Sequence, residues 1–479
     1  MEVETLTHVQ QGMYTYVGQE FVQGQAEGSN TCGSHLCITL LSLTPLLLIW
    51  PDLKNKIART LFLLFLQTYR TTWTDFFTGF ISLLREHPTQ NSSLNAQTTD
   101  LYLRVLHEIS TELSDTSLRL NKPYARLNKD AEMRDAVREQ DAISIAGSVF
   151  SILAESLQGL ANPPLASSND RYSVSGKVAE NIIELTVRVV GDYVAWIDIN
   201  LIISEPSVPL LFQCLQLPQV SVRIAATEAF IETVGKGLPI GDKLQLIQVL
   251  GLNEVLARLL EMSNAAITNT TVLDDQETIF REKLAKLLNS VGVELIKICE
   301  DSASAAEQKV QARSMAVQLF PLVLAFIADS NDDVSCALLS FTSTTLSLFK
   351  KEKKRDAAGH LTADKEQFLT QLLQAVLTKM SYGPDAEWYV GGGSEDDDEE
   401  GVAHFLDMRK NMRTLSDAIA WIAEPIYVGI TKALLSGISE AIDAGGSTMA
   451  SLTWQQVELA LHVLYIFGEA VKCESALSQ

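Results

Sequence analysis

The stretch Glu205–Leu252 decides the fold, and it reads EPSVPLLFQCLQLPQVSVRIAATEAFIETVGKGLPIGDKLQLIQVLGL. Pro206 and Pro209 suit the first turn of one helix, because the missing N–H of proline costs nothing there. Pro218 opens a second helix in the same way. Proline-marked turns therefore divide this stretch into two or three short helices.

The second of these helices has one broad apolar face. Its apolar residues recur at spacings of three and four, which is the helical period. Gly235 ends this helix, and Asp242 suits the N-cap of a third helix that continues toward Leu259. Small alanines beside large apolar residues, with a turn every fifteen to twenty residues, are typical of stacked helical hairpins. We therefore predict an all-α, right-handed superhelical solenoid of HEAT (alpha-alpha) repeats. The face comprises Val222, Ala225, Ala226, Ala229, Phe230, Thr233 and Val234.

Composition agrees with a repeat array. The chain has 479 residues, more than one hydrophobic core usually holds. Hydrophobic residues make up 47% and aromatic residues only 7%, which suits helix stacking better than a β-sandwich. The formal net charge of −22 excludes a global basic field for nucleic acid, and favours basic protein partners or solubility.

We predict three parts along the chain. Residues 1–50 form an irregular part with a partial helix near 13–27, residues 51–160 form a first helical segment, and residues 161–479 continue the repeats. The Pro- and Ser-containing linker at 161–169 marks the second boundary. Residues 391–401 form an acidic loop, because six consecutive carboxylates follow three glycines and repel one another.

The apolar run Leu36–Trp50 allows more than one interpretation. It spans fewer residues than the twenty or so that a membrane-crossing helix needs, and it lacks basic flanks. A buried helix is one alternative, and an aberrant insertion over residues 32–50 is another. We expect no membrane insertion. A membrane-anchored scaffold is a further alternative, and this run is the only feature that supports it.

Signals for chemistry are weak. The six cysteines are scattered, and we expect them to be reduced. Cys32 and Cys37 flank His35, but nothing downstream completes a tetrahedral metal site. His107 and His462 lie on apolar helices and are expected to be packed residues. The chain contains no phosphate-binding loop and no metalloprotease motif. We therefore predict that it is not an enzyme and needs no cofactor or metal.

Residues after Pro51 resemble the exportin-1-like segment of karyopherins. That segment typically has an N-K-L-A helix, a Tyr-Pro turn and a W-x-x-F-F motif. Here Asn55–Ala58 reads NKIA, Tyr69 stands at the turn, and Trp73–Phe77 reads WTDFF. Arg70 replaces the usual proline.

Later segments are similar, in the same order, to exportin-T, the tRNA exportin family. The resemblance covers residues 13–30 and 51–475. The matching segments are 100–109, the polar 128–138, 220–226, 237–239, the acidic loop with 405–410, and 454–469.

The resemblance implies a nuclear export receptor. It would bind tRNA together with the GTP-bound Ran GTPase, pass nuclear pore proteins and shuttle between nucleus and cytoplasm as a monomer. The packing around Trp73–Phe77 and the acidic loop would serve Ran, with Glu395, Asp396, Asp397, Asp398, Glu399 and Glu400 as contacts. Local basic charge, rather than a family motif, selects the candidates for tRNA: Arg104, Lys122, Arg126, Lys129, Arg134, Arg138, Lys350, Lys351, Lys353, Lys354 and Arg355.

Two departures qualify the resemblance. Members of the family are much longer, so the sequence looks like a partial chain, and residues 32–50 have no counterpart, which suggests translated intron or mis-spliced sequence. The alternative function is a generic HEAT-repeat adaptor, or a protein-cargo karyopherin without RNA binding, which the acidic total favours. For Lys350–Arg355, a solvated helix end is the simple alternative to a phosphate patch or localisation signal. For 391–400 the simple alternative is a solvated linker.

Overall fold

The computed structural model describes residues 51–69, 71, 73–85, 94–114, 122–161, 176–269, 275–355, 361–383, 399–444 and 452–477. Helices carry almost all of these residues. Their one extended pairing is an isolated bridge between Arg85 and Leu94. The prediction of an all-α chain of HEAT-type helical repeats is confirmed, and the contacts divide the chain into two units, after Lys236.

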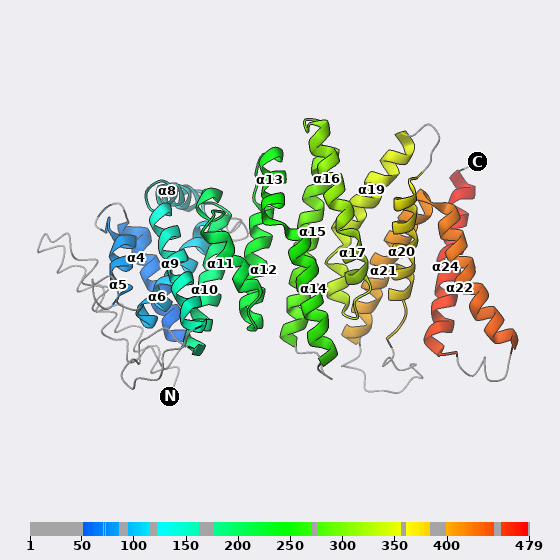
Figure 1. The fold of residues 1–479 in the computed structure, drawn as a ribbon, viewed down its shortest axis with the longest axis horizontal. Helices are drawn as coiled ribbons and strands as arrows, with labels where there is room; N and C mark the ends of the chain where they lie inside the picture. The colour runs from blue at the N-terminus through cyan, green and yellow to red at the C-terminus, as the bar shows by residue number, and fades with distance from the viewer. Residues whose placement is uncertain are drawn as a thin grey trace, which may run out of the picture. The chain divides into compact units, whose positions relative to one another are not determined.

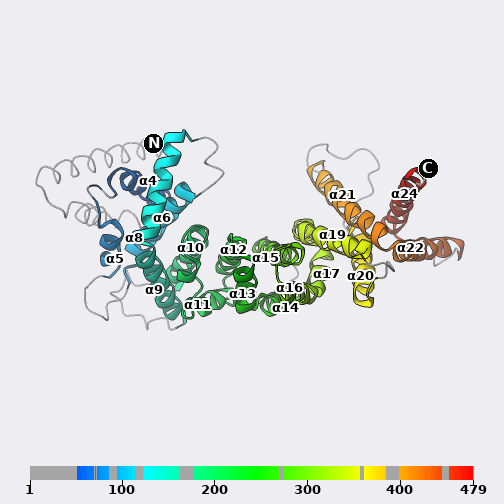
Figure 2. The same ribbon diagram turned by 90° about the horizontal axis from the view of Figure 1, so that it is seen from above.

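The first unit is built from paired helices. Within it, α9 and α11 lie in one row and α10 and α12 in the other, and each helix packs on its neighbours (Figures 1 and 2). Helix α6 joins α4 to α10. The helices are α4 Pro51–Thr68, α5 Phe76–Leu83, α6 Ala96–Ser114, α8 Tyr124–Gln140, α9 Ala142–Ala161, α10 Gly176–Val194, η1 Ile199–Leu201, α11 Ser207–Leu215 and α12 Val220–Gly235.

Small residues let α10 and α12 approach closely, as the alanine pattern predicts. A Cβ atom on Gly191 would lie only 3.2 Å from the Cα atom of Ala229. Ala225, Ala226 and Ala229 are all buried. Close packing of this kind gains dispersion contacts along the helix pair, and it leaves no room for larger side chains.

An aromatic cluster holds α4 against α5. Trp73, Phe76 and Phe77 are buried, and the Phe65 ring centroid lies 4.9 Å from that of Phe76 and 5.7 Å from that of Phe77. The Trp73 and Phe76 centroids are 4.7 Å apart at a steep angle, the edge-to-face geometry that aromatic pairs prefer. The residues of the WTDFF motif thus pack on the helix that contains the NKIA motif.

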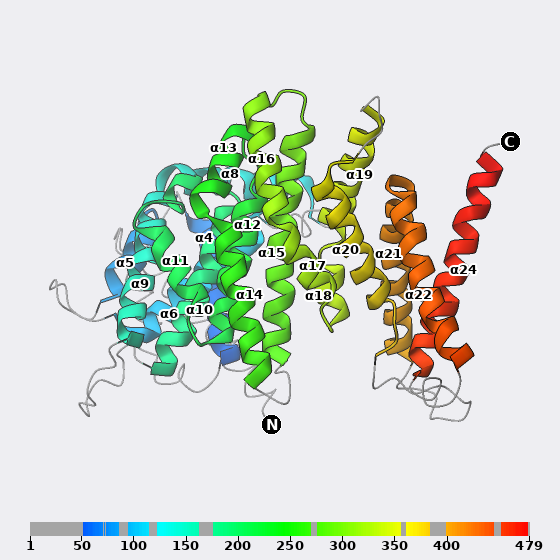
Figure 3. The ribbon, with the colours of Figure 1, turned by 45° about the vertical axis from the view of Figure 1, so that its right-hand side comes forward.

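The second unit continues the same architecture. Helices α15, α19 and α21 pack on one another in succession, and α20, α21, α22 and α24 form its last layers (Figure 3). The helices are α13 Ile240–Leu250, α14 Leu252–Asn269, α15 Asp275–Glu300, α16 Ala306–Gln318, α17 Phe320–Ile327, α18 Asp332–Cys336, α19 Leu339–Arg355, α20 Ala363–Lys379, α21 Glu399–Ile422, α22 Glu424–Ala444 and α24 Trp454–Leu477.

Two details of the stretch Glu205–Leu252 differ from the prediction. Pro239, not Asp242, occupies the N-cap of α13, and Asp242 lies in the first turn, where its charge suits the helix dipole. The third helix does not continue to Leu259. Gly251 adopts a left-handed φ of 55° and ends α13, so that Leu259 belongs to α14.

Helix α8 was not predicted. The segment is polar and has no apolar stripe, so hydrophobic periodicity did not reveal it. Ion pairs one turn apart support it instead, among them Arg126 with Asp130 at 2.9 Å.

The irregular N-terminal part and nearly all of the predicted linker fall outside the described residues. This applies to residues 1–50, with the proposed insertion at 32–50, and to 162–175, so both boundaries stay predictions. Two described stretches, Ala142–Ala161 and Ala306–Ile327, are long and apolar enough to cross a membrane. Core helices pass the same test, and the second stretch is divided at Leu319 between α16 and α17.

Candidate functional site

Lys122 links α6 to α8, and Arg126 forms an ion pair within α8. The Lys122 ammonium donates to the Glu112 carbonyl oxygen at 2.7 Å and pairs with the Asp130 carboxylate at 3.1 Å. Its side chain is only 16% exposed. Arg126 Nε lies 2.9 Å from the other Asp130 oxygen. An RNA phosphate would have to compete with these carboxylates for both cations.

Arg104 is also engaged within the protein. Its Nε donates to Asp100 at 3.0 Å, and its Nη1 donates to Asn55 at 2.6 Å. Lys54 pairs with the same Asp100 at 3.0 Å. This network ties α6 to α4, and Asn55 opens the NKIA motif of the family resemblance. Asn55 of this motif therefore helps to hold α4 against α6.

The remaining candidates on α8 are more available. Lys129 is exposed and has no ion pair among the described residues. Arg138 pairs with Asp135 at 3.1 Å but stays 47% exposed, and Arg134 lies 4.0 Å from the same carboxylate. A cavity of about 180 Å³ lies beside Lys122 and Arg134. Acidic residues balance the basic ones along this helix, so the local field for phosphate is weak.

Lys350, Lys351 and Lys353 have partners at the C-terminal end of α19. Lys350 Nζ lies 4.2 Å from the centroid of the Trp421 ring. Lys351 pairs with Glu300 at 2.6 Å, and Lys353 donates to the carbonyl oxygen of Ile422 at 2.8 Å. These contacts hold α19 to α15 and to the end of α21.

Lys354 and Arg355 have no ion pair among the described residues, and both are exposed. They complement the negative end of the α19 dipole, as a solvated helix end would. The neighbouring Glu352 does not neutralise them, because Arg313 and Lys365 already hold its carboxylate. Lys129, Lys354 and Arg355 are thus the candidate cations free to meet a ligand.

The structure does not describe the acidic loop. Four of its predicted Ran contacts lie outside the described residues, and for the last two the structure describes only the backbone, at the start of α21. They stay predictions. Trp73, Phe76 and Phe77 are buried in the aromatic cluster, so they support the first helices rather than forming a contact surface. The four outside are Glu395, Asp396, Asp397 and Asp398, and the two in α21 are Glu399 and Glu400.

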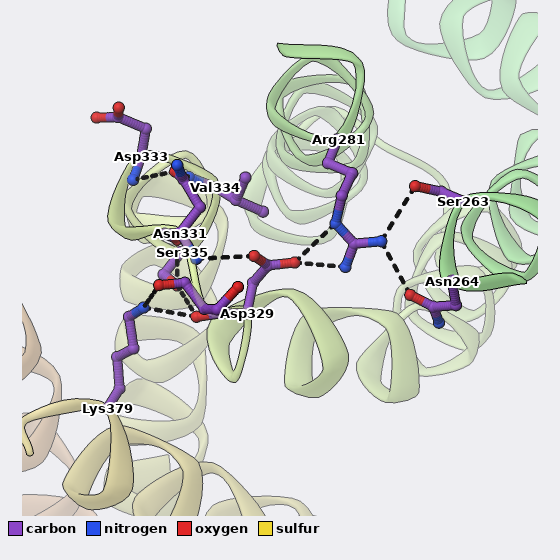
Figure 4. A network of polar contacts seen from close by, with 10 residues as sticks. Ser263, Asn264, Arg281, Asp329, Asn331, Asp333, Val334, Ser335 and Lys379 are labelled. Carbon is purple, nitrogen blue, oxygen red and sulfur yellow. Dashed lines mark hydrogen bonds and ion pairs between the residues drawn. The ribbon is translucent and has the colours of Figure 1, made fainter. Parts of the chain in front are cut away.

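Sequence reasoning missed a buried charge network in the second unit (Figure 4). Arg281 on α15 donates through Nε to Asp329 at 2.9 Å and through Nη1 to Ser263 at 3.1 Å and Asn264 at 2.9 Å. Lys379 on α20 donates to the Asp329 carbonyl at 2.5 Å. The Arg281 guanidinium thus has hydrogen-bond partners on α14 and in the turn between α17 and α18, which makes burial of its charge tolerable.

Sequence reasoning also missed a buried ion pair in the segments that resemble exportin-T. Arg409 on α21 binds Glu458 on α24 through two parallel hydrogen bonds of 2.8 and 2.5 Å. Its Nε donates to the Met380 carbonyl at 2.7 Å, and its guanidinium lies 4.8 Å from the Tyr382 ring and 5.0 Å from the Phe405 ring. The side chain is only 7% exposed, so the arginine joins α20, α21 and α24 rather than meeting a ligand.

No arrangement for catalysis or metal binding appears in the described part of the chain, where no group of three His, Cys, Asp or Glu residues could hold an ion. Burial raises the pKa of the Cys214 thiol to about 12, so this cysteine is a poor nucleophile. His107 is not simply packed: its Nδ1 lies 2.6 Å from Asp192. The hydrogen bond to Asp192 raises the pKa of the His107 ring despite burial.

Comparison with known proteins assigns the class. The chain matches the family model of exportin 1-like proteins over residues 51–230 and that of Exportin-T over residues 306–479. Its fold is similar to the cytosolic state of importin 13, with a TM-score of 0.57 at 11% identity, over 91% of this chain and 46% of that one. The chain is a HEAT-repeat protein of the karyopherin class.

Relatives narrow this class to one family. Exportin-T of Mycosarcoma maydis is 34% identical over 98% of this chain and 42% of its own length. Exportin-T of Laccaria bicolor is 33% identical over 98% of this chain and 41% of its own length. The chain belongs to the exportin-T family, and it spans less than half the length of these relatives.

Proposed function

We propose that this protein is a nuclear export receptor that binds tRNA together with GTP-bound Ran and carries the tRNA through the nuclear pore to the cytoplasm. The observation that carries this proposal is the 34% identity to an exportin-T over 98% of the chain. The receptor works by binding rather than by catalysis. It shuttles as a monomer between nucleus and cytoplasm and contacts nuclear pore proteins on the way.

Coupled binding supplies the mechanism. If tRNA and GTP-bound Ran favour the same conformation of the repeats, each raises the affinity of the other, and hydrolysis of GTP releases both. The acidic loop offers carboxylates to a basic face of Ran. The tRNA is read by shape and phosphates, with Lys129, Lys354 and Arg355 as the cations that need not leave an internal partner.

The proposal is tested by measuring tRNA binding to the full chain at moderate salt. The three conditions are Ran loaded with a non-hydrolysable GTP analogue, Ran with GDP, and no Ran. We expect binding to strengthen only with the GTP form. Equal binding in all three conditions would contradict the coupling. Retention of GTP-bound Ran without tRNA would leave a carrier whose RNA site lies elsewhere in the longer relatives.

The second candidate is a HEAT-repeat adaptor or protein-cargo karyopherin. The net charge of −22 favours it, because an acidic surface attracts basic proteins and repels RNA. The balanced charges of α8 point the same way. A well-folded sample that binds no tRNA but retains basic protein ligands would establish this alternative, and the absence of Ran binding as well would favour the adaptor.

A further inference from the structure

An aromatic and basic patch lies where α19 and α21 end. We define the α19–α21 patch as Lys350, Lys354, Arg355 and Trp421. The Trp421 side chain is 57% exposed, an unusual state for so large an aromatic residue. Lys350 Nζ lies 4.2 Å from its ring centroid, within the range of a cation–π contact.

The helices themselves hold this patch in place. Helix α19 packs against α21, and the Lys353 ammonium donates to the carbonyl oxygen of Ile422, one residue beyond Trp421, at 2.8 Å. The indole and the end of α19 therefore keep a defined relation to each other. A preformed surface loses less conformational entropy when it binds a ligand.

Two acidic residues near the patch are paired with other cations. Glu352 is held by Arg313 and Lys365, and Glu300 pairs with Lys351 at 2.6 Å. These two carboxylates are therefore not free to neutralise Lys354 and Arg355. A positive area survives on a chain whose net charge is −22.

We propose that the α19–α21 patch binds unpaired nucleotides of an RNA, with a base stacked on Trp421 and phosphates at Lys354 and Arg355. This inference rests on the proposed function and adds the part of the RNA that is recognised here. Every base has a π-face that stacks on an aromatic ring, whatever the sequence. An acidic peptide would use the cations but would gain little from an exposed indole, so RNA is the better fit.

The test measures binding of two labelled RNAs to the full chain in the presence of Ran with a GTP analogue. One is a single-stranded oligoribonucleotide of about ten nucleotides, near the site size of single-strand binders. The other is a blunt RNA duplex with the same number of phosphates. Trp421→Ala should weaken single-strand binding about tenfold, from the loss of one stacked base, and leave duplex binding unchanged. Trp421→Phe should retain most of the affinity, because a smaller ring still stacks.

Replacing Lys354 and Arg355 should change the salt dependence of binding. Lys354→Ala with Arg355→Ala should reduce the slope of log affinity against log salt by about 1.4 for the single strand, since each lost phosphate contact contributes about 0.7. Trp421→Ala should leave this slope unchanged. Lys432→Ala on α22, also exposed, is the matched control and should change neither quantity.

Three outcomes would overturn the inference. One is wild-type single-strand affinity in Trp421→Ala that circular dichroism shows to be folded. Another is tighter binding of a polyglutamate peptide than of the single strand, which would make the patch a protein site. If tRNA still binds with GTP-bound Ran in either case, only the inference fails. If the wild-type chain binds no RNA at all, the proposed function fails with it.

Discussion

Ion pairs separate the basic residues that join helices from those that stay available to a ligand. Arg104, Lys122 and Arg409 have the charge of RNA contacts, yet each joins helices through partners at hydrogen-bond distance. Lys354 and Arg355 have the same charge and no such partner in the described part of the chain. Availability, rather than charge alone, decides which cations can serve a ligand.

The bidentate pair of Arg409 and Glu458 should be one of the most sensitive contacts of the second unit. Arg409→Met leaves the Glu458 carboxylate unpaired, and we expect a loss of about 3 kcal/mol, the low end for a broken buried pair because Glu458 is 23% exposed. Hydrogen exchange of the α21 and α24 amides in urea would measure it.

Arg413 offers a matched control on the same helix. It also pairs with a glutamate of α24, Glu469, but the two side chains are 36% and 39% exposed. Arg413→Met should therefore cost less than about 1 kcal/mol. Equal losses for the two variants would show that burial does not set the strength of these pairs.

His107 should make stability depend on pH. Its pKa is raised in the folded state, first by the hydrogen bond to Asp192. The stabilisation is therefore present in full below the unfolded pKa, about 6.5, and is lost as the pH rises through the higher folded pKa. Because the ring is 44% exposed, we expect less than about 1 kcal/mol.

Nuclear magnetic resonance titration of the ring would check this prediction. Asp192→Asn should lower the pKa of His107 and flatten the pH dependence of unfolding between mildly acidic and mildly basic conditions. An unchanged His107 pKa in this variant would contradict the assigned cause.

At the scale of the elements, close helix approaches hold the repeats together. A Cβ atom on Gly292 of α15 would lie 2.3 Å from the ring of Phe341 on α19, which is fully buried. Gly292→Ala should therefore lower stability by about 1–3 kcal/mol through overpacking, although alanine is the better helix former. Thermal unfolding would show a lower Tm.

Gly437 on α22 provides the opposite case. A Cβ atom there meets nothing within 4 Å, so Gly437→Ala should raise stability by up to about 1 kcal/mol.

A second variant tests the cause assigned to Gly292→Ala. Combining Gly292→Ala with Phe341→Leu should recover part of the stability that Gly292→Ala loses. If Gly292→Ala proved neutral, the approach of α15 and α19 would be looser than described.

At the scale of the whole molecule, the salt dependence of tRNA binding should count the free cations. If Lys129, Lys354 and Arg355 make three phosphate contacts, the slope of log affinity against log salt should be about −2 to −3. A fourfold rise in salt would then weaken binding about 16- to 64-fold. Fluorescence anisotropy of labelled tRNA over a salt series would measure the slope.

Alanine variants show whether these three residues make the phosphate contacts. Replacing Lys129, Lys354 and Arg355 by alanine should remove most of the slope, whereas Lys432→Ala should not change it. A slope near −6 in the wild-type chain would mean that engaged residues such as Arg104 and Lys122 leave their carboxylates to meet the RNA.

Much of the architecture follows from local patterns in the sequence. The spacing of Val222, Ala225 and Ala229 identified a buried helix face, and Pro218 and Gly235 marked its ends, because both signals act within one or two turns. The same patterns failed for α8, because its sequence is mostly polar and charged, with ion pairs one turn apart such as Arg126 with Asp130. They also misplaced the N-cap at Asp242, because α13 already begins at Ile240, directly after Pro239.

The sequence by itself determined that the chain is helical, that its helices bury one face in a repeat array, and that its motifs follow the order of the exportin-T family. Only the tertiary structure decided which basic residues are available. Lys351 meets Glu300, and Arg409 meets Glu458, across about fifty residues of chain. Such partners are brought together by helix packing, and no local pattern specifies them. The physical reason is that the type of side chain fixes its charge, whereas the packing of the helices decides which opposite charge lies next to it.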